Sequence, residues 1–386
     1  FHKAFSSVFD GNITVIIVAI ILMIFGSGTM LSFGYSLLTG VILNFLCGVV
    51  TSKLIIKSLS CYDKLRKPSL YGNGKKSEKV VRFYQNRIKC YIVSLVIFIF
   101  GIVCIFTNGV NLDIQFKGGA IINYTYTEQV DTNKVMNVVE DALGRQCDVQ
   151  TKKDLTSDST KLVLNLAGKE GLASADQDTL TNALKEAFPD NNIKLSDVSV
   201  VEPFIGKDFA IDSTKAIIFS AILIILYVWF SFRKVSGLSA GVTGLIALLH
   251  DVLIVFFAFV VFNIPINDSF IAAALTILGF SINDTIVIYD RIRENKLLYG
   301  NKMPIEEIVN KSISQSFTRS LNTNLCTLLS IVVVYIFACV QDIQSIKSFA
   351  LPMIFGIISG CYSTICIAGP IWVSWQKFKN KRKKTV

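Results

Sequence analysis

The sequence Gly279-Phe-Ser-Ile-Asn-Asp-Thr-Ile-Val-Ile-Tyr-Asp-Arg-Ile-Arg-Glu-Asn295 joins the end of a long apolar run to a charged segment. Its apolar half contains one carboxylate, Asp284. A carboxylate in a membrane-length apolar helix is costly, so such residues are rare and usually face a protein interior or a water-filled path. We therefore interpret Asp284 as a proton-accepting group. The alternative is a buried carboxylate satisfied by Asn283, Thr285 or a neighbouring helix.

The whole chain has the composition of a membrane protein. Of its 386 residues, 52% are hydrophobic and only 17% are charged, and the mean hydropathy is +0.54. Soluble domains rarely combine so little charge with so much apolar content. Stretches long enough to cross a hydrocarbon core of about 30 Å predict a polytopic α-helical protein with about eight transmembrane helices. They cover residues 12–28, 34–58, 91–108, 214–231, 236–263, 267–289, 324–340 and 346–374.

Cysteine and histidine usage argues against metal or redox chemistry. The nine cysteines are scattered, mostly within apolar runs, and the chain has only two histidines. No metal-ligand spacing appears, so we expect neither a metal site nor a cofactor. The sequence also shows no phosphate loop and no nucleophile with a base, so we do not expect an enzyme.

Residues 109–213 form a region of a different kind. Acidic residues outnumber basic ones by 17 to 10 there, although the whole chain carries a formal net charge of +10. Alternating and helical patterns predict the order β-α-β-β-α-β, which is that of a ferredoxin-like α+β unit. The expected strands are 113–117 with 120–126, 147–152, 161–166 and 193–202, and the helices start at 131 or 132 and at 174.

The distribution of Lys and Arg predicts the topology. Positive charge lies in a basic linker before the third span, at Arg233-Lys234, in an expected loop over 291–323 and in the tail. The intervening connections 29–33, 264–269 and 341–345 contain neither Lys nor Arg. Both chain ends are therefore predicted to be cytoplasmic and the acidic domain extracytoplasmic.

This topology gives a domain division, and it suggests that the linker is solvated and touches anionic membrane lipid rather than nucleic acid. The division is 1–60 (two helices), 61–90 (cytoplasmic linker), 91–108 (one helix), 109–213 (α+β domain), 214–376 (five helices) and 377–386 (cytoplasmic tail).

The first two predicted helices look like a copy of the last two. The aligned residues are Phe5 with Phe317, Asn12 with Asn324, Ser32-Phe33 with Ser348-Phe349, and Gly40 with Gly356. Duplicated halves occur in several transporter folds. The counterpart of the Asp284 helix should then lie upstream of Phe1, so we expect the chain to begin inside a longer polypeptide.

Three further polar residues lie in or beside the apolar spans. His250 and Asp251 are near the middle of one span, and either could join a relay with Asp284 or make an interhelical hydrogen bond. Arg319 precedes the 324–340 span by about one turn. It could pair with ionised Asp284 or act as a positive-inside anchor.

These motifs resemble the SecD/SecF protein-export membrane proteins, namely SecF and the C-terminal part of fused SecDF proteins. The 279–295 block is similar to the family signature, and His250-Asp251 matches its His-Asp pair. Residues 1–60 resemble the last two helices of SecD. The matched motif residues are Asp290, Arg291, Arg293, Glu294 and Asn295, together with Gly118 and Gly119 of an Asp-Phe-x-Gly-Gly-like element that has one extra residue here.

The resemblance implies a member of the resistance-nodulation-division superfamily in the bacterial inner membrane. It would work with a SecD-like half beside the SecYEG channel and use the proton motive force to assist late translocation of an exported polypeptide. Asp284 would carry the proton and Arg319 would be its basic partner. Two alternative hypotheses for the function are a proton-driven efflux transporter of small amphiphiles and a passive scaffold of the channel.

Overall fold

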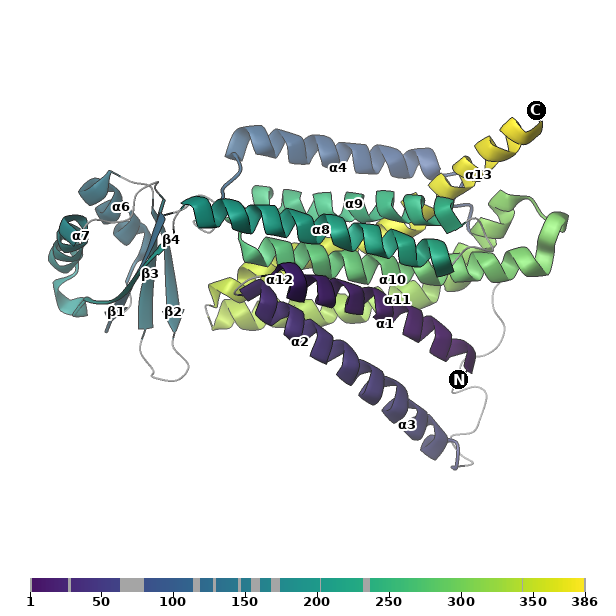
Figure 1. Cartoon of the computed structure of the whole chain (residues 1–386), viewed down its shortest axis with the longest axis horizontal. Helices are drawn as coiled ribbons and strands as arrows, with labels where there is room; N and C mark the ends of the chain where they lie inside the picture. The colour runs from purple at the N-terminus through teal and green to yellow at the C-terminus, as the bar shows by residue number, and fades with distance from the viewer. Residues whose placement is uncertain are drawn as a thin grey trace.

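A computed structural model describes most of the chain. It covers residues 2–26, 29–62, 80–113, 119–127, 130–144, 147–153, 160–167, 174–201, 203–231, 237–341 and 343–384. Figure 1 shows a bundle of long helices with a small α+β unit at one end. Both chain termini lie at the opposite end of the bundle.

The long helices are apolar enough to form a multi-pass membrane protein. Their bounds are α1 (His2–Phe25), α2 (Thr29–Leu43), α3 (Ser52–Leu59), α4 (Arg87–Asn108), α8 (Pro203–Ser231), α9 (Gly237–Val261), α10 (Asp268–Tyr299), α11 (Ile305–Val340), α12 (Gln344–Ser363) and α13 (Gly369–Lys384). A π-helical segment, Asn44–Thr51, joins α2 to α3, and another, Thr364–Ala368, joins α12 to α13.

Within the described residues, seven helices have the length and composition of membrane spans, where the sequence predicted about eight. The difference is the first predicted span, 12–28. Its helix α1 ends at Phe25, and the apolar part Gly11–Phe25 is short. At 1.5 Å per residue this part is about 22 Å long, less than the hydrocarbon core of about 30 Å.

The expected loop over 291–323 is wrong. Helix α10 continues to Tyr299 and α11 already begins at Ile305, so only a short turn separates them. Few residues in this segment break a helix before Gly300, which has a φ of 48°. The charged residues that suggested a loop instead form ion pairs three positions apart on one helix, which support helical structure.

Helix α8 starts earlier than the predicted span 214–231. It begins at Pro203, directly after the last strand of the α+β unit. Proline is favoured at the first helical position, because its missing N–H has no helical partner there and its φ is already suitable. The α+β unit therefore passes into the membrane bundle through one continuous helix.

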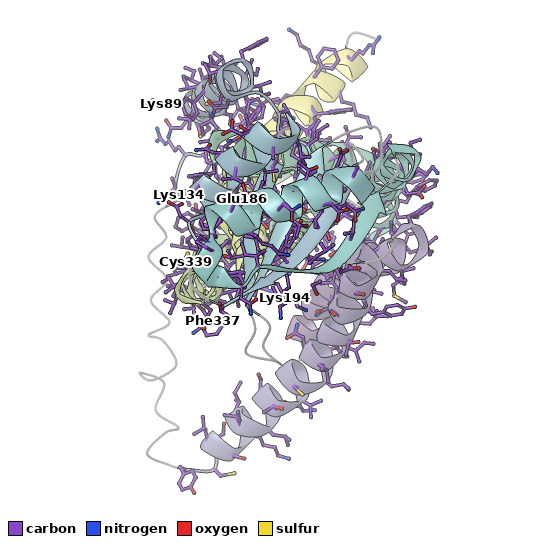
Figure 2. The ribbon with its side chains drawn as sticks, turned by 90° about the vertical axis from the view of Figure 1, so that its left-hand side faces the viewer. Lys89, Lys134, Glu186, Lys194, Phe337 and Cys339 are labelled. Carbon is purple, nitrogen blue, oxygen red and sulfur yellow. The ribbon has the colours of Figure 1, made fainter. Side chains whose placement is uncertain are left out.

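The α+β unit contains a four-stranded antiparallel sheet and two helices. Along the chain come β1 (Gly119–Tyr126), α6 (Thr132–Leu143), β2 (Cys147–Lys153), β3 (Thr160–Ala167), α7 (Ser174–Ala187) and β4 (Lys194–Val201). The order β-α-β-β-α-β is as predicted, and the strands lie in the order β2-β3-β1-β4. Figure 2 looks onto this end of the molecule, with α6 and α7 in front of the sheet and Lys134 and Glu186 on them.

The two helices and the sheet share one apolar core. Alternate residues of β1 are buried, including Ile122 and Tyr124, and they pack with Leu164 of β3 and Leu180 of α7. This is the alternation that predicted the strands. Of the expected strand 113–117, only Asp113 lies within the described residues, and its backbone N–H donates to the carbonyl of Ile266, 3.0 Å away, in the α9–α10 connection.

Helix α10 is the centre of the bundle. In its apolar window 83% of the residues are buried, against 11% for α4 and for α11. It lies between α1 and α11, the first helices of the two predicted repeat copies. Two observations agree with the repeat. The aligned Phe33 and Phe349 contact each other with ring centroids 5.9 Å apart, and a π-helical segment follows each of α2 and α12.

Candidate functional site

Asp284 is buried in the middle of α10 and is held by the neighbouring helix. Its side chain is 7% exposed, and it accepts a hydrogen bond from the amide of Asn324 on α11. The same amide donates to the carbonyl of Ser320 at 2.8 Å, which fixes its orientation on α11. Asn324 is 5% exposed. Among the predicted alternatives for a partner of Asp284, the structure therefore shows a neighbouring helix.

The two residues beside Asp284 face other helices. The hydroxyl of Thr285 lies 3.2 Å from the Ser281 carbonyl and 3.1 Å from the Thr364 hydroxyl. Asn283 lies against α1. A Cβ built on Gly11 of α1 would lie 2.1 Å from the side-chain oxygen of Asn283. Only glycine allows α1 to approach α10 so closely at this level.

Arg319 lies on the same helix as Asn324 but is exposed. The guanidinium interacts electrostatically with Asp284. Arg319 is five residues before Asn324, about 7.5 Å along the helix axis. It is thus near enough to sense the charge of Asp284, and its pairing with that carboxylate stays a prediction.

His250 and Asp251 form a separate buried network. Asp251 is 0% exposed and accepts hydroxyl hydrogen bonds from serines on two other helices. The donors are Ser281 at 2.7 Å, Ser359 at 2.6 Å and Ser363 at 2.7 Å. His250 Nδ1 lies 3.2 Å from the same carboxylate. This network joins α9, α10 and α12, which is the interhelical alternative considered for the pair.

Glycines on α12 allow this network to form. A Cβ built on Gly356 would lie 2.7 Å from Ile277 and 2.9 Å from Val255, and one on Gly360 would lie 3.3 Å from Ser281. The Gly-x-x-x-Gly spacing therefore lets α12 approach α9 and α10 closely enough for its serines to reach Asp251.

The charged motif after Asp284 holds α10 to α11. The buried Asn295 amide donates to Ser312 at 2.8 Å and to Gln315 at 2.9 Å, and Gln315 also accepts from Arg291. On the α10 surface, Arg291 pairs with Glu294 and Arg293 pairs with Asp290. Of these motif residues, Arg291 and Asn295 therefore join α10 to α11, whereas the two ion pairs lie on α10 alone. All five motif residues are about two to three turns from Asp284.

The glycine motif belongs to the α+β unit. Gly118 lies outside the described residues. Gly119 is the first residue of β1, where it is buried and has a φ of 152°, a value that L side chains rarely adopt. It pairs with Ala167 and Val201, so its place is in the sheet and not near Asp284.

Four polar residues of the networks around Asp284 and Asp251 were not predicted as site residues from the sequence: Asn324, Ser281, Ser359 and Ser363. Asn324 had a usable signal, because the repeat alignment pairs it with Asn12 in the other copy. The serines had none, since serine is common in membrane helices and hydrogen bonds to its own backbone.

The described residues contain no group of three or more His, Cys, Asp or Glu side chains placed to hold a metal ion. What the site does contain is two buried carboxylates with different surroundings. Among the described residues, Asp251 accepts from three hydroxyl groups, whereas the one side-chain hydrogen bond to Asp284 comes from Asn324.

The fold and the site define a polytopic membrane protein with an acidic residue in its central helix and an α+β unit at one end of the bundle. Residues 179–378 match the family model described as "Protein export membrane protein SecD/SecF, C-terminal". The chain belongs to the SecD/SecF family of protein-export membrane proteins.

Known relatives agree with this assignment. The chain is 30% identical to the protein translocase subunit SecDF of Bacillus subtilis, over 97% of this chain and 51% of the relative. It is 30% identical to the subunit SecF of Sebaldella termitidis, over 79% of this chain and 94% of that protein. The chain thus spans about half the length of the SecDF relatives it matches and nearly all of SecF.

A solved structure shows the same fold. The crystal structure of SecDF from Thermus thermophilus, a translocon-associated membrane protein, superposes with a TM-score of 0.79 at 25% identity. The match covers 98% of this chain and 49% of that structure. The likeness therefore includes the two N-terminal helices as well as the part that resembles SecF.

Proposed function

We propose that this chain is the SecF-like part of a proton-driven accessory component of the Sec protein-export machinery, which assists late translocation of secreted proteins. Membership of the SecD/SecF family supports the export role. The observation that carries the proton-driven mechanism is Asp284, buried in the central helix and bonded to Asn324 of α11.

The unequal surroundings of the two carboxylates single out Asp284. Three hydroxyl donors and His250 hold Asp251 in place, so moving this side chain would break several interhelical hydrogen bonds at once. Within the described part of the chain, the amide of Asn324 is the one hydrogen-bond donor to Asp284, and Arg319 interacts with it electrostatically. Protonation of Asp284 would remove its attraction to Arg319 and weaken its bond to Asn324, so α11 would repack against α10.

Each proton that crosses the membrane potential releases about 2.3 kcal/mol per 100 mV. In the proposed mechanism this energy moves α11 against α10, and the α+β unit moves with the bundle. That unit passes into the membrane helices through α8, which is continuous from Pro203 to Ser231. The motion of the unit would help to draw the exported polypeptide outward.

The proposed setting is the bacterial inner membrane, with both chain ends cytoplasmic and the α+β unit extracytoplasmic. The position of both termini at the end of the bundle opposite the α+β unit supports this orientation (Figure 1). We further propose that the α+β unit is a ferredoxin-like domain, supported by its element order and by the antiparallel strand order β2-β3-β1-β4.

The proposed partners are a SecD-like half, the SecYEG channel and the exported polypeptide. The names of the SecDF relatives, and the half of their length that this chain does not cover, support a SecD-like half that is fused or separate. We propose no enzymatic activity for the chain.

The test is the substitution Asp284→Asn, which keeps the shape of the side chain but cannot carry a charge. We expect proton-motive-force-dependent export to be lost while the protein still assembles in the membrane. The matched control is Asp290→Asn on the same helix, where the carboxylate is 43% exposed and pairs with Arg293. Exposed ion pairs contribute at most about 1 kcal/mol, so this variant should export normally.

Normal export by Asp284→Asn would overturn the proton-driven mechanism and favour a passive scaffold of the channel. An efflux transporter of small amphiphiles would instead show itself as increased drug susceptibility in a deletion strain, with export unchanged.

A further inference from the structure

A cavity of about 440 Å³ lies on the side of the bundle, between α4, α9 and α12. This volume is in the range of small-molecule binding sites. Helices α10 and α11 contribute no lining residue, so the cavity is separate from Asp284 and Asn324. Helix α4 is largely exposed along its length, and the cavity therefore faces the lipid rather than the centre of the bundle.

The walls of the cavity are apolar and rich in aromatic rings. Phe100 of α4, Phe257 of α9, Phe262 just past the end of α9, and Phe355 of α12 all line it. The rings of Phe262 and Phe355 are 5.4 Å apart and tilted by 40°. Aromatic rings prefer offset or edge-to-face contacts with other rings, so these walls suit a flat aromatic ligand better than a flexible alkyl chain.

One polar side chain with an unused hydrogen-bonding atom lines the same cavity. His250 is 6% exposed, and its Nδ1 lies 3.2 Å from Asp251 and 3.3 Å from the Ser359 hydroxyl. Ser359 donates its hydrogen to Asp251, so Nδ1 carries a hydrogen and donates to the same carboxylate. In the neutral imidazole the other ring nitrogen, Nε2, is then an acceptor.

Nε2 of His250 is buried and has no hydrogen-bond partner within the part of the chain that the structure describes. A buried acceptor left without a donor costs about 1–3 kcal/mol. The group that would remove this cost is a hydroxyl, because it can donate without adding charge. The rings of Phe98 and Tyr362 lie 5.2 and 5.9 Å from the imidazole, so a ligand ring here would join an existing aromatic cluster.

The depth of His250 limits the kind of ligand. His250 precedes the end of α9 at Val261 by eleven residues, or about 16 Å. A hydroxyl at His250 would therefore lie inside the hydrocarbon region, where a charged or zwitterionic head group is costly. The ligand must be soluble in the membrane interior and carry a hydroxyl on an apolar body.

We propose that this cavity binds a membrane-soluble aromatic alcohol, a phenol or hydroquinone ring with an apolar substituent, whose hydroxyl donates to Nε2 of His250. The ring packs between Phe257 and Phe355, and the substituent extends toward Phe262 and the lipid. The site does not depend on Asp284, so it stands apart from the proposed proton-driven function.

The test uses the imidazole nitrogens as reporters, because the 386 residues contain only His2 and His250. Full-length protein labelled with ¹⁵N-histidine is placed in lipid nanodiscs, and the signal that is missing in His250→Phe is assigned to His250. The probes are 4-hexylphenol and hexylbenzene, which differ only in the hydroxyl. We expect a saturable shift of Nε2 with 4-hexylphenol and an apparent affinity about tenfold weaker for hexylbenzene.

Filling the cavity supplies the second comparison. Ala258 lines it, and Ala258→Phe should abolish the shift caused by 4-hexylphenol. Ile358→Phe fills the cavity from the opposite wall and replaces the first variant if that one does not fold. Equal responses to the two probes in the unmodified protein overturn the proposal, and so does a phenol response that survives in a folded, filled variant. The two-probe comparison requires no variant to fold other than the one used for assignment.

Discussion

The side-chain amide of Asn324 on α11 donates a hydrogen bond to the carboxylate of Asp284 on α10, and both side chains are more than nine-tenths buried. This bond is the one direct side-chain link from the described residues to the central carboxylate. Its donor also bonds to the backbone of its own helix, so any change in the charge of Asp284 acts directly on α11.

Asn324→Ala removes this donor and leaves a buried carboxylate without a hydrogen bond. We expect a loss of about 1–3 kcal/mol in the free energy of unfolding and reduced proton-motive-force-dependent export. The control is Asn322→Ala, the same substitution at an exposed position on the same helix, which should change stability by less than about 0.5 kcal/mol. Denaturation of the purified protein and an export assay in cells measure the two effects. Equal behaviour of the two variants would contradict the assigned role of Asn324.

Gly356→Ala tests the close approach of α12. The added methyl group would lie 2.7 Å from Ile277 and 2.9 Å from Val255, and overpacking of this kind costs about 1–3 kcal/mol. Gly40 is its aligned partner in the first repeat, and nothing lies within 4 Å of a Cβ built there. Because both substitutions add the same helix propensity, Gly40→Ala is the matched control in a thermal unfolding experiment on this chain. Similar melting temperatures for the two variants would show that α12 can shift to make room for the methyl group without loss of stability.

Asn295 and Ser312 test whether the family motif links α10 to α11. Their side chains are bonded at 2.8 Å, and both are buried. A double-mutant cycle with Asn295→Ala and Ser312→Ala should give a coupling free energy of about 0.5–3 kcal/mol. Chemical denaturation of the four proteins supplies the values. Strict additivity would mean that the two residues act independently.

Tyr124 predicts how the α+β unit responds to alkaline pH. Burial raises the pKa of Tyr124 above its ordinary value of 10.0, although a hydrogen bond with Thr181 opposes this shift. The folded unit therefore holds the phenol proton more tightly than the unfolded chain does. This contribution to stability is complete below pH 10 and is lost as the pH rises through the raised pKa.

Tyr124→Phe should lower the free energy of unfolding by about 1 kcal/mol near neutral pH, because the hydrogen bond with Thr181 is lost. It should also reduce the further loss of stability above pH 10. Thermal unfolding between pH 8 and 11 measures both, with the exposed Tyr62→Phe as the control. An unchanged alkaline response in Tyr124→Phe would assign the pH sensitivity to another group.

Much of the fold was readable from composition and periodicity. Apolar runs predicted the membrane helices, because a helix crossing a bilayer must hide its backbone in internal hydrogen bonds behind apolar side chains. Alternation and helical spacing likewise predicted the β-α-β-β-α-β order of the α+β unit. The ends of the helices were less predictable. The charged segment after Asp284 looked like a loop, and only its ion pairs and the Asn295 contacts show why it remains helical.

The chemistry at the centre of the bundle divides in the same way. The cost of a carboxylate in an apolar helix was enough to single out Asp284, since that cost depends only on the local sequence. The partner of Asp284 could not be predicted in this way. Asn324 is 40 residues away in the sequence and reaches Asp284 only when α11 packs on α10. The serines around Asp251 come together for the same kind of reason, through the glycines that bring α12 against α9 and α10. The local sequence shows that a carboxylate in an apolar helix requires a hydrogen-bond donor. Which side chain supplies that donor depends on which helices pack together.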